Sequence, residues 1–170
     1  MPTLILRPNA DVTKTSWSGE FDATNLYANV DESSKSEIDY NRGTDITTNQ
    51  WLAVKIGSTV YKSSAHSYLG ATVELCTWEK TTKPSDSSAW TWSDIDNLVS
   101  GCVYNNTTTD YPLLYGYPNH TTESGTITKV TFKSYLNLYL SGKTYSLSDY
   151  MTWVEVEYTE AAGGKFLVTM

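Results

Sequence analysis

Short runs of alternating apolar and polar residues recur along the chain, and this two-residue period is typical of half-buried β-strands. The run over 51–56 is the clearest example, because Leu52, Val54 and Ile56 share one face. Gly57-Ser58 follows as a tight turn into 59–61, so these two runs predict a hairpin. In all, strands are predicted over 3–7, 26–30, 51–56, 59–61, 72–78, 102–104, 126–135, 136–140, 152–158 and 165–170.

One segment departs from the strand period and predicts a short helix near 94–100. Ser93 is a residue type that caps helix N-termini, and Asp96 three residues later resembles the second half of a capping box. Asp94 and Asp96 place negative charge in the first turn, and Gly101 provides a stop. The predicted strand–helix motif comprises Trp90 and Trp92 (on one face of an extended chain), Ser93, Asp94, Asp96, Leu98 and Gly101.

Many short strands with a single helix indicate an all-β fold, an antiparallel β-sandwich that is jelly-roll-like. We expect one sandwich domain over 1–158 and a strand-like C-terminal extension over 159–170, after the Gly163-Gly164 break. Two polar stretches, near 31–49 and 105–125, predict long loops that are candidate contact surfaces. A short edge strand near 38–40 fits within the first. The alternative for the second is that Leu113, Leu114 and Tyr115 form a small strand capping the sandwich.

Charge and hydropathy narrow the classes of partner. The 170-residue chain carries a formal net charge of −7, with its cationic residues scattered, so we expect neither nucleic-acid binding nor a polybasic membrane-surface patch. No apolar run approaches the roughly 20 residues that span a bilayer. Met1 to Ile5 lacks the pattern of a secretory signal, so synthesis in a host cytoplasm is expected.

Tyrosine and tryptophan dominate the aromatic residues, with 13 Tyr and 6 Trp against 3 Phe. These side chains suit half-buried strand faces, subunit interfaces and sugar-binding surfaces, because each joins apolar area to a polar group. Ordinary sheet packing explains the composition equally well. The candidates for an interface or for sugar stacking are Trp17, Trp51, Trp78, Tyr111, Tyr115, Tyr117 and Trp153.

The spacing of histidines and carboxylates along the sequence gives little indication of catalysis, and no catalytic residue, metal ligand or cofactor is predicted. The two histidines, His66 and His120, have no metal-ligand spacing and are interpreted as ordinary loop residues. Glu155 and Glu157 share a strand face, where a general acid and base seldom enclose a cleft. We therefore expect a protein that is not an enzyme.

Two cysteines, Cys76 and Cys102, lie in two different predicted strands. Three arrangements fit this placement: a disulfide, a pair of small buried residues, or neither. Synthesis in a cytoplasm favours thiols, whereas later exposure outside a cell allows oxidation.

Three blocks of the sequence resemble a β-sandwich family found in structural proteins of tailed phages and head-tailed archaeal viruses. They are an opening Leu6-Arg7-Pro8-Asn9 strand followed by Trp17, the turn over 90–98, and the closing strand over 154–158. The pattern reads LRPN…W…WxWxDIDxL…VEVxY. The resemblance implies a non-enzymatic virion protein, either a capsid-surface decoration or turret-type component or a head-tail accessory component. Its implied partners are capsid or tail proteins and further copies of itself, and its acidic charge favours a position away from packaged DNA.

A carbohydrate-binding module on a receptor-binding appendage is the alternative, with a host-surface glycan as its ligand. It requires several exposed aromatic rings along one face. Burial of most tryptophans in the core would exclude it.

Overall fold

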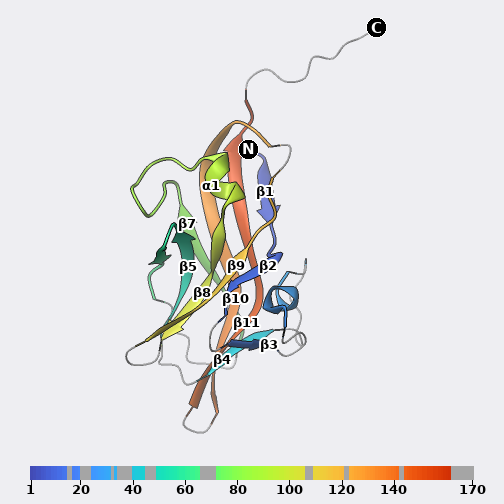
Figure 1. The fold of residues 1–170 in the computed structure, drawn as a ribbon, viewed down its shortest axis with the longest axis vertical. Helices are drawn as coiled ribbons and strands as arrows, with labels where there is room; N and C mark the ends of the chain where they lie inside the picture. The colour runs from blue at the N-terminus through green and yellow to red at the C-terminus, as the bar shows by residue number, and fades with distance from the viewer. Residues whose placement is uncertain are drawn as a thin grey trace.

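Two antiparallel β-sheets pack face to face in the computed structural model of the chain, with one short α-helix at one end (Figure 1). The predicted all-β sandwich is therefore confirmed. The structure describes residues 1–14, 17–19, 24–31, 33, 40–44, 49–65, 72–105, 109–120, 123–141 and 144–161.

Sheet A has six strands among the described residues: β1 (Thr3–Leu6), β3 (Trp17–Gly19), β4 (Asn41–Thr44), β7 (Glu74–Lys80), β10 (Thr126–Ser141) and β11 (Thr144–Thr159). Their order is β3-β4-β11-β10-β7, and β1 pairs with the later half of β11. β10 and β11 form a long hairpin that runs the length of the molecule (Figure 1). The two strands predicted over 126–135 and 136–140 are one strand, and a register shift lies between Tyr135 and Leu136, where the predicted strands meet.

In the part of the chain that the structure describes, sheet B has five strands: β2 (Ala10–Thr13), β5 (Gln50–Ile56), β6 (Thr59–Lys62), β8 (Val99–Asn105) and β9 (Asp110–Gly116), in the order β2-β9-β8-β5-β6. The predicted β5–β6 hairpin is confirmed, with Gly57 in the left-handed region at φ 60°.

Several predicted boundaries are wrong. The long loop expected over 105–125 contains β9, an inner strand of sheet B, so the alternative of a strand at Leu113 to Tyr115 is the one confirmed. The loop expected over 31–49 contains β4, while the strand suggested near 38–40 lies mostly outside the described residues. The strand predicted over 26–30 is instead a 3₁₀ helix, η1 (Leu26–Asn29).

η1 forms because a side chain from another element caps it. The Asp11 carboxylate accepts the backbone N–H groups of Leu26 and Tyr27 at 2.8 and 2.7 Å. Lys14 stabilises that carboxylate at 3.1 Å. Alternating apolar residues predicted a strand here, and this tertiary cap overrides the local pattern.

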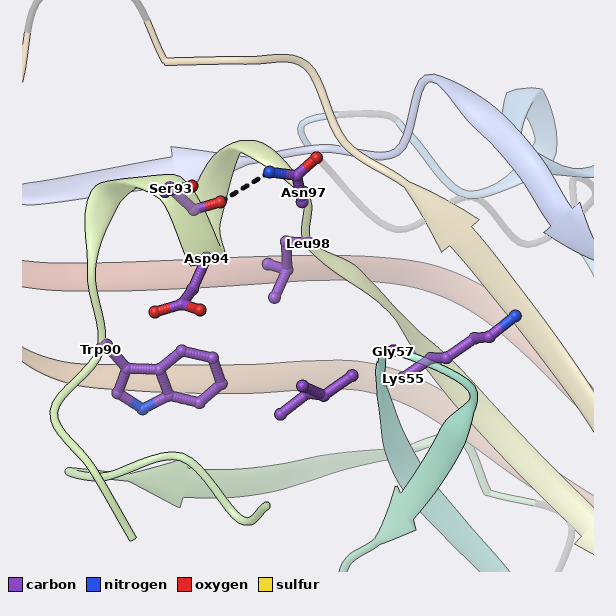
Figure 2. Close-up of a pocket in the computed structure, with 8 residues that line it drawn as sticks. Lys55, Gly57, Trp90, Ser93, Asp94, Asn97 and Leu98 are labelled. Atoms are coloured by element: carbon purple, nitrogen blue, oxygen red, sulfur yellow. Dashed lines mark hydrogen bonds between the residues drawn. The ribbon is translucent and has the colours of Figure 1, made fainter. Parts of the chain in front are cut away.

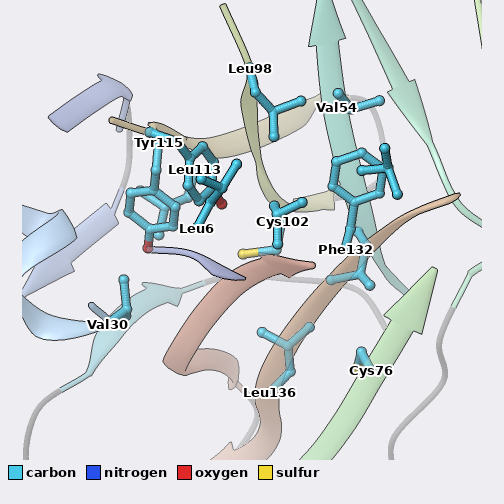
Figure 3. Close-up of a cluster of buried hydrophobic side chains, with 14 of the residues drawn as sticks. Leu6, Val30, Val54, Cys76, Leu98, Cys102, Leu113, Tyr115, Phe132 and Leu136 are labelled. Atoms are coloured by element: carbon cyan, nitrogen blue, oxygen red, sulfur yellow. The ribbon is translucent and has the colours of Figure 1, made fainter. Parts of the chain in front are cut away.

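A single large apolar cluster fills the space between the sheets (Figure 3). β5 contributes Leu52 and Val54 to it, as the alternation predicts, and β10 contributes Phe132 and Leu136. On β7, Cys76 is buried, whereas Leu75 is 44% exposed. β7 is an outer strand of its sheet, so the identity of its buried face depends on the opposite sheet.

A line of buried polar groups also crosses the sandwich. Asn29 donates to Asn41, Asn41 donates to the Tyr115 hydroxyl, and that hydroxyl donates to Asp149, over 2.9, 2.8 and 2.9 Å. Ser134 adds a further hydrogen bond to Asp149 at 2.7 Å. Burial raises the pKa of Asp149, against the hydrogen bonds from Ser134, Tyr115 and Thr152, which lower it. Because each group has a partner, the network fixes how the two sheets register.

Candidate interaction surface

The predicted motif forms a helix, α1 (Trp92–Asp96), but its cap lies two residues earlier than expected. Thr91 is the N-cap: its hydroxyl accepts the Asp94 N–H at 3.2 Å, and the Asp94 carboxylate accepts the Thr91 N–H at 2.8 Å. The assignment of Ser93 as N-cap with Asp96 as its partner is therefore wrong. Burial would raise the pKa of Asp94, but hydrogen bonds from Thr91 and Lys83 outweigh it and lower the pKa.

Asp96 attaches α1 to the segment that precedes β10. Its carboxylate contacts the Nδ1 of His120 at 2.5 Å and accepts the His120 N–H at 3.2 Å. The imidazole packs against Trp92, with 4.6 Å between ring centroids, and Trp92 donates to Gly125 O at 3.0 Å. His120 lies in a loop, as the sequence indicated, but its side chain contacts both Asp96 and Trp92. Its contacts hold α1 beside the N-terminal end of β10.

The two outer members of the motif, Trp90 and Gly101, also differ from expectation. Trp90 is 4% exposed and donates to Lys80 O at 3.2 Å, and it does not share an extended face with Trp92, which belongs to the helix. Gly101 lies inside β8 and is not the helix stop. A Cβ at Gly101 would lie 2.1 Å from Leu113 O, so the close approach of β9 requires glycine there.

A groove lies between α1 and the β5–β6 turn, with a volume of about 210 Å³ (Figure 2). Trp90 and Leu98 form its apolar floor, while Lys55, Asp94 and Asn97 lie at its polar rim. The volume is below the roughly 300 Å³ at which ligand pockets begin. The groove offers no basis for a small-molecule site.

The candidate aromatics are mostly core residues. Trp17, Trp153 and Tyr117 are 9%, 8% and 6% exposed, and Tyr115 is fully buried. Trp17 packs edge to face on Tyr104, and Tyr104 in turn stacks on the half-buried Tyr111. Half-buried Trp78 packs on Phe132, and Trp51 lies under the Lys62 ammonium at 4.4 Å.

No tryptophan is exposed, and the structure describes all six. The described part of the chain therefore has no row of solvent-exposed tryptophan rings on which a sugar could stack. This burial argues against the carbohydrate-binding alternative.

Cys76 and Cys102 are both buried thiols in the main core and are not joined by a disulfide. Of the three arrangements left open by the sequence, the pair of small buried residues is the one observed. Burial, together with the nearby Asp149 carboxylate, raises the pKa of Cys102 well above its ordinary value.

The outer face of sheet B carries a second apolar cluster that sequence reasoning missed. Ala53, Val103 and Leu114 are at most 1% exposed, although they alternate with the residues that face the main core. The partly exposed side chains of Trp51, Val60 and Val99 pack against them. We call these six residues the sheet B surface. Val12, 45% exposed, extends it across Gly116.

The outer face of sheet A differs from the sheet B surface in chemistry. Lys129 pairs with Glu157 at 2.8 Å and with Glu79 at 3.2 Å, and Lys133 pairs with Glu155 at 2.8 Å. Burial would raise the pKa of Glu155, but hydrogen bonds from Lys133 and Trp153 lower it. Cross-strand ion pairs of this kind are typical of a face that meets water.

Among the described residues, no group of three or more His, Cys, Asp or Glu is placed to hold a metal ion. His66 lies outside them. No helix in the described ranges is long and apolar enough to cross a membrane. The chain matches no family model, no curated protein and no solved structure.

Proposed function

We propose that this protein is a non-enzymatic structural component of a virion that docks on neighbouring virion proteins through the sheet B surface. Within a virion, the two roles we propose are a capsid-surface decoration or turret-type component and a head-tail accessory component. Its mechanism is adhesion, in which apolar area is removed from water without any turnover.

The contrast between the two outer faces carries this proposal. An antiparallel sheet in a sandwich commonly has one face on the core and one in water. The outer face of sheet A is mixed, because it carries cross-strand ion pairs together with the exposed side chains of Ile5 and Leu75. Sheet B instead has apolar clusters on both faces, and Trp51, Val60 and Val99 leave part of the outer one accessible. An apolar face on a protein in water is typical of a protein–protein contact.

The rim of this surface adds polar specificity. Lys62 crosses over Trp51 and pairs with Asp110 at 2.6 Å, which joins β6 to β9. An apolar centre with a charged rim is the usual anatomy of an interface between proteins. The net charge of −7 argues against nucleic acid as a partner, because the phosphate backbone is also negatively charged.

The virion part of the proposal is supported by the resemblance of the three sequence blocks. Those blocks contribute Leu6 at the end of β1, Trp17 of β3, α1 and part of β11, and Leu6 pairs with Val154 of β11. The Trp92 ring packs edge to face on Tyr158, with 5.1 Å between centroids, so two of the blocks are in direct contact.

The test measures co-sedimentation with purified capsids and tails of the virus that encodes the chain. The native chain is expected to bind one of them. Val60→Lys should weaken binding by about tenfold or more, because a desolvated charge in an interface costs upwards of about 1.4 kcal/mol. Thr59→Lys is the matched control, since it adds the same charge one residue away on the exposed turn end of β6. A native chain that binds neither particle, or equal binding by both variants, contradicts the proposal.

A further inference from the structure

β7 presents the longest unpaired side among the outer strands that the structure describes. It pairs with β10 from Glu74 opposite Leu136 to Lys80 opposite Val130, without a register shift. On its other side no described strand is paired with it. The other outer strands, β6, β2, β1 and β3, have four residues or fewer. An uninterrupted edge of this length displays a row of backbone donors and acceptors ready for another strand.

The usual protections of an edge strand are weak along β7. It contains no proline and no bulge, and its charges lie at its two ends. Its centre, Leu75 to Thr77, is uncharged, and Leu75 is 44% exposed on the outer face. On the inner face Trp78 is only partly buried where it packs against the core.

Among the described residues, nothing covers the sandwich beside this edge. β7 ends sheet A, and β6 ends sheet B on the same side, since β7 lies against β5 (Figure 1). Tyr61 of β6, like Trp78, packs on the main core but remains half-buried. An added strand with large apolar side chains would complete the burial of this side of the core.

The chain itself contains a segment of suitable chemistry outside the described residues. Residues 165–170 read Lys-Phe-Leu-Val-Thr-Met and follow Gly163-Gly164. Phe166, Val168 and Met170 alternate with Leu167 and Thr169, and the run has high β-propensity with one charge and no proline. Its six residues nearly match the seven of β7.

A path within one chain from β11 to the open side of β7 is obstructed. β11 ends at Thr159 opposite Thr126, and Trp92 of α1 is bonded to Gly125 directly beside this point. Residues 160–164 span at most about 17 Å. Three strand spacings already require about 14 Å, which leaves too little chain to pass around α1.

We propose that residues 165–170 of one copy add as a strand to the free side of β7 in a second copy. In this arrangement Phe166 and Val168 face Trp78, and Leu167 lies on the side of Leu75. Each copy donates one strand and accepts one, so the contact closes in a reciprocal dimer or a ring. The inference extends the assembly role proposed above, but it rests on the β7 edge and not on the sheet B surface.

The first test is sedimentation velocity of the full chain over a range of concentrations. The native chain should form oligomers, and Phe166→Asp combined with Val168→Asp should leave monomers. Thr169→Asp, on the other face of the segment, is the control and should still associate. Amide exchange at those N–H groups of β7 that do not face β10 should be slow in the native oligomer and fast in the double variant. A native chain that stays monomeric, or oligomers that persist unchanged in the double variant, overturns the proposal.

The second test uses cysteine cross-linking to separate exchange between copies from pairing within one. Thr77→Cys chains mixed with Thr169→Cys chains should give a disulfide-linked heterodimer on mild oxidation. The native thiols at Cys76 and Cys102 are buried, so the unmodified chain measures the background. A chain carrying both substitutions that yields only a cross-linked monomer contradicts the proposal.

The experiments can contradict either proposal without contradicting the other. Loss of particle binding in Val60→Lys with the cross-link intact supports both of them. Cross-linking without any particle binding overturns only the proposed function.

Discussion

The Tyr115 hydroxyl donates a hydrogen bond to the Asp149 carboxylate at 2.9 Å, joining β9, an inner strand of sheet B, to β11, the central strand of sheet A. Both residues are fully buried. No cation appears among the described partners of Asp149, which are hydroxyl and backbone donors. The carboxylate therefore depends on these neutral donors to offset its lost hydration.

Removing the Tyr115 hydroxyl should expose this dependence. Tyr115→Phe deletes one donor to a buried charge, so we expect a loss of about 1–3 kcal/mol in the free energy of unfolding, measured in urea. Tyr117→Phe is the matched control. Its hydroxyl bonds to Ser100 at 3.0 Å, a neutral pair, so the loss should be about 1 kcal/mol. Equal losses in the two variants would refute a special role for the Asp149 bond.

Asp149 should also make stability depend on pH in an unusual direction. Its pKa is raised in the folded state, so the folded chain holds more protons than the unfolded chain from about pH 4 upward, until the folded-state pKa is passed. The contribution of Asp149 to the free energy of unfolding falls as the pH rises through that window. The native chain should therefore gain stability relative to Asp149→Asn as the pH is lowered.

Glu155 should give the opposite sign. Its pKa is lowered by Lys133 and Trp153, so its contribution is present above the unfolded-state pKa and is lost as the pH falls through the folded-state value. The advantage of the native chain over Glu155→Gln should shrink on acidification. Urea titrations at several pH values measure both differences. A parallel trend for the two variants would contradict the account.

The cap of α1 provides a fourth prediction. Thr91→Ala removes the side chain that accepts the Asp94 N–H and should cost about 1 kcal/mol in the free energy of unfolding. Ser93→Ala, two residues later, changes an exposed position inside the helix and should cost under about 0.5 kcal/mol. Thermal or urea unfolding distinguishes them. If Ser93→Ala is the more damaging, the cap has been placed wrongly.

Gly101 tests the packing of β8 on β9. Gly101→Ala would put a methyl group 2.1 Å from Leu113 O, and backbone cannot yield as a flexible side chain can. We expect a loss of about 3 kcal/mol or failure to fold. Gly116→Ala is the control, because its nearest contacts, Ala10 and Val12, would be at 3.7 Å. Similar stabilities for the two variants would show that the strands separate easily.

Sequence periodicity correctly predicted those elements that are determined by their own residues and by the adjoining turn. The 51–56 run became β5, its turn and hairpin partner formed as expected, and Val154 and Val156 face the core as their alternation indicates. The position of a strand within its sheet was harder to predict from the sequence. β9 was hidden because Pro112 and neighbouring polar residues look like a loop, yet as an inner strand it buries Leu113 and Leu114.

Long-range partners account for the remaining differences. Nothing near Asp11 in sequence shows that it caps η1, and nothing near Asp96 shows that it meets His120. The sheet B surface has a sequence signal in retrospect, because β5 and β8 read as nearly continuous apolar runs, with Leu52-Ala53-Val54 and Cys102-Val103-Tyr104. A run of this kind is typical of a strand covered on both faces.

Side-chain footprinting by hydroxyl radicals, with and without bound particle, tests the docking surface most directly. We predict that oxidation of Trp51 and Val60 falls on binding while oxidation of Ile5, exposed on the opposite sheet, is unchanged. Unchanged oxidation at Trp51 and Val60, together with protection of Ile5, would contradict the assignment of the sheet B surface as the site of assembly.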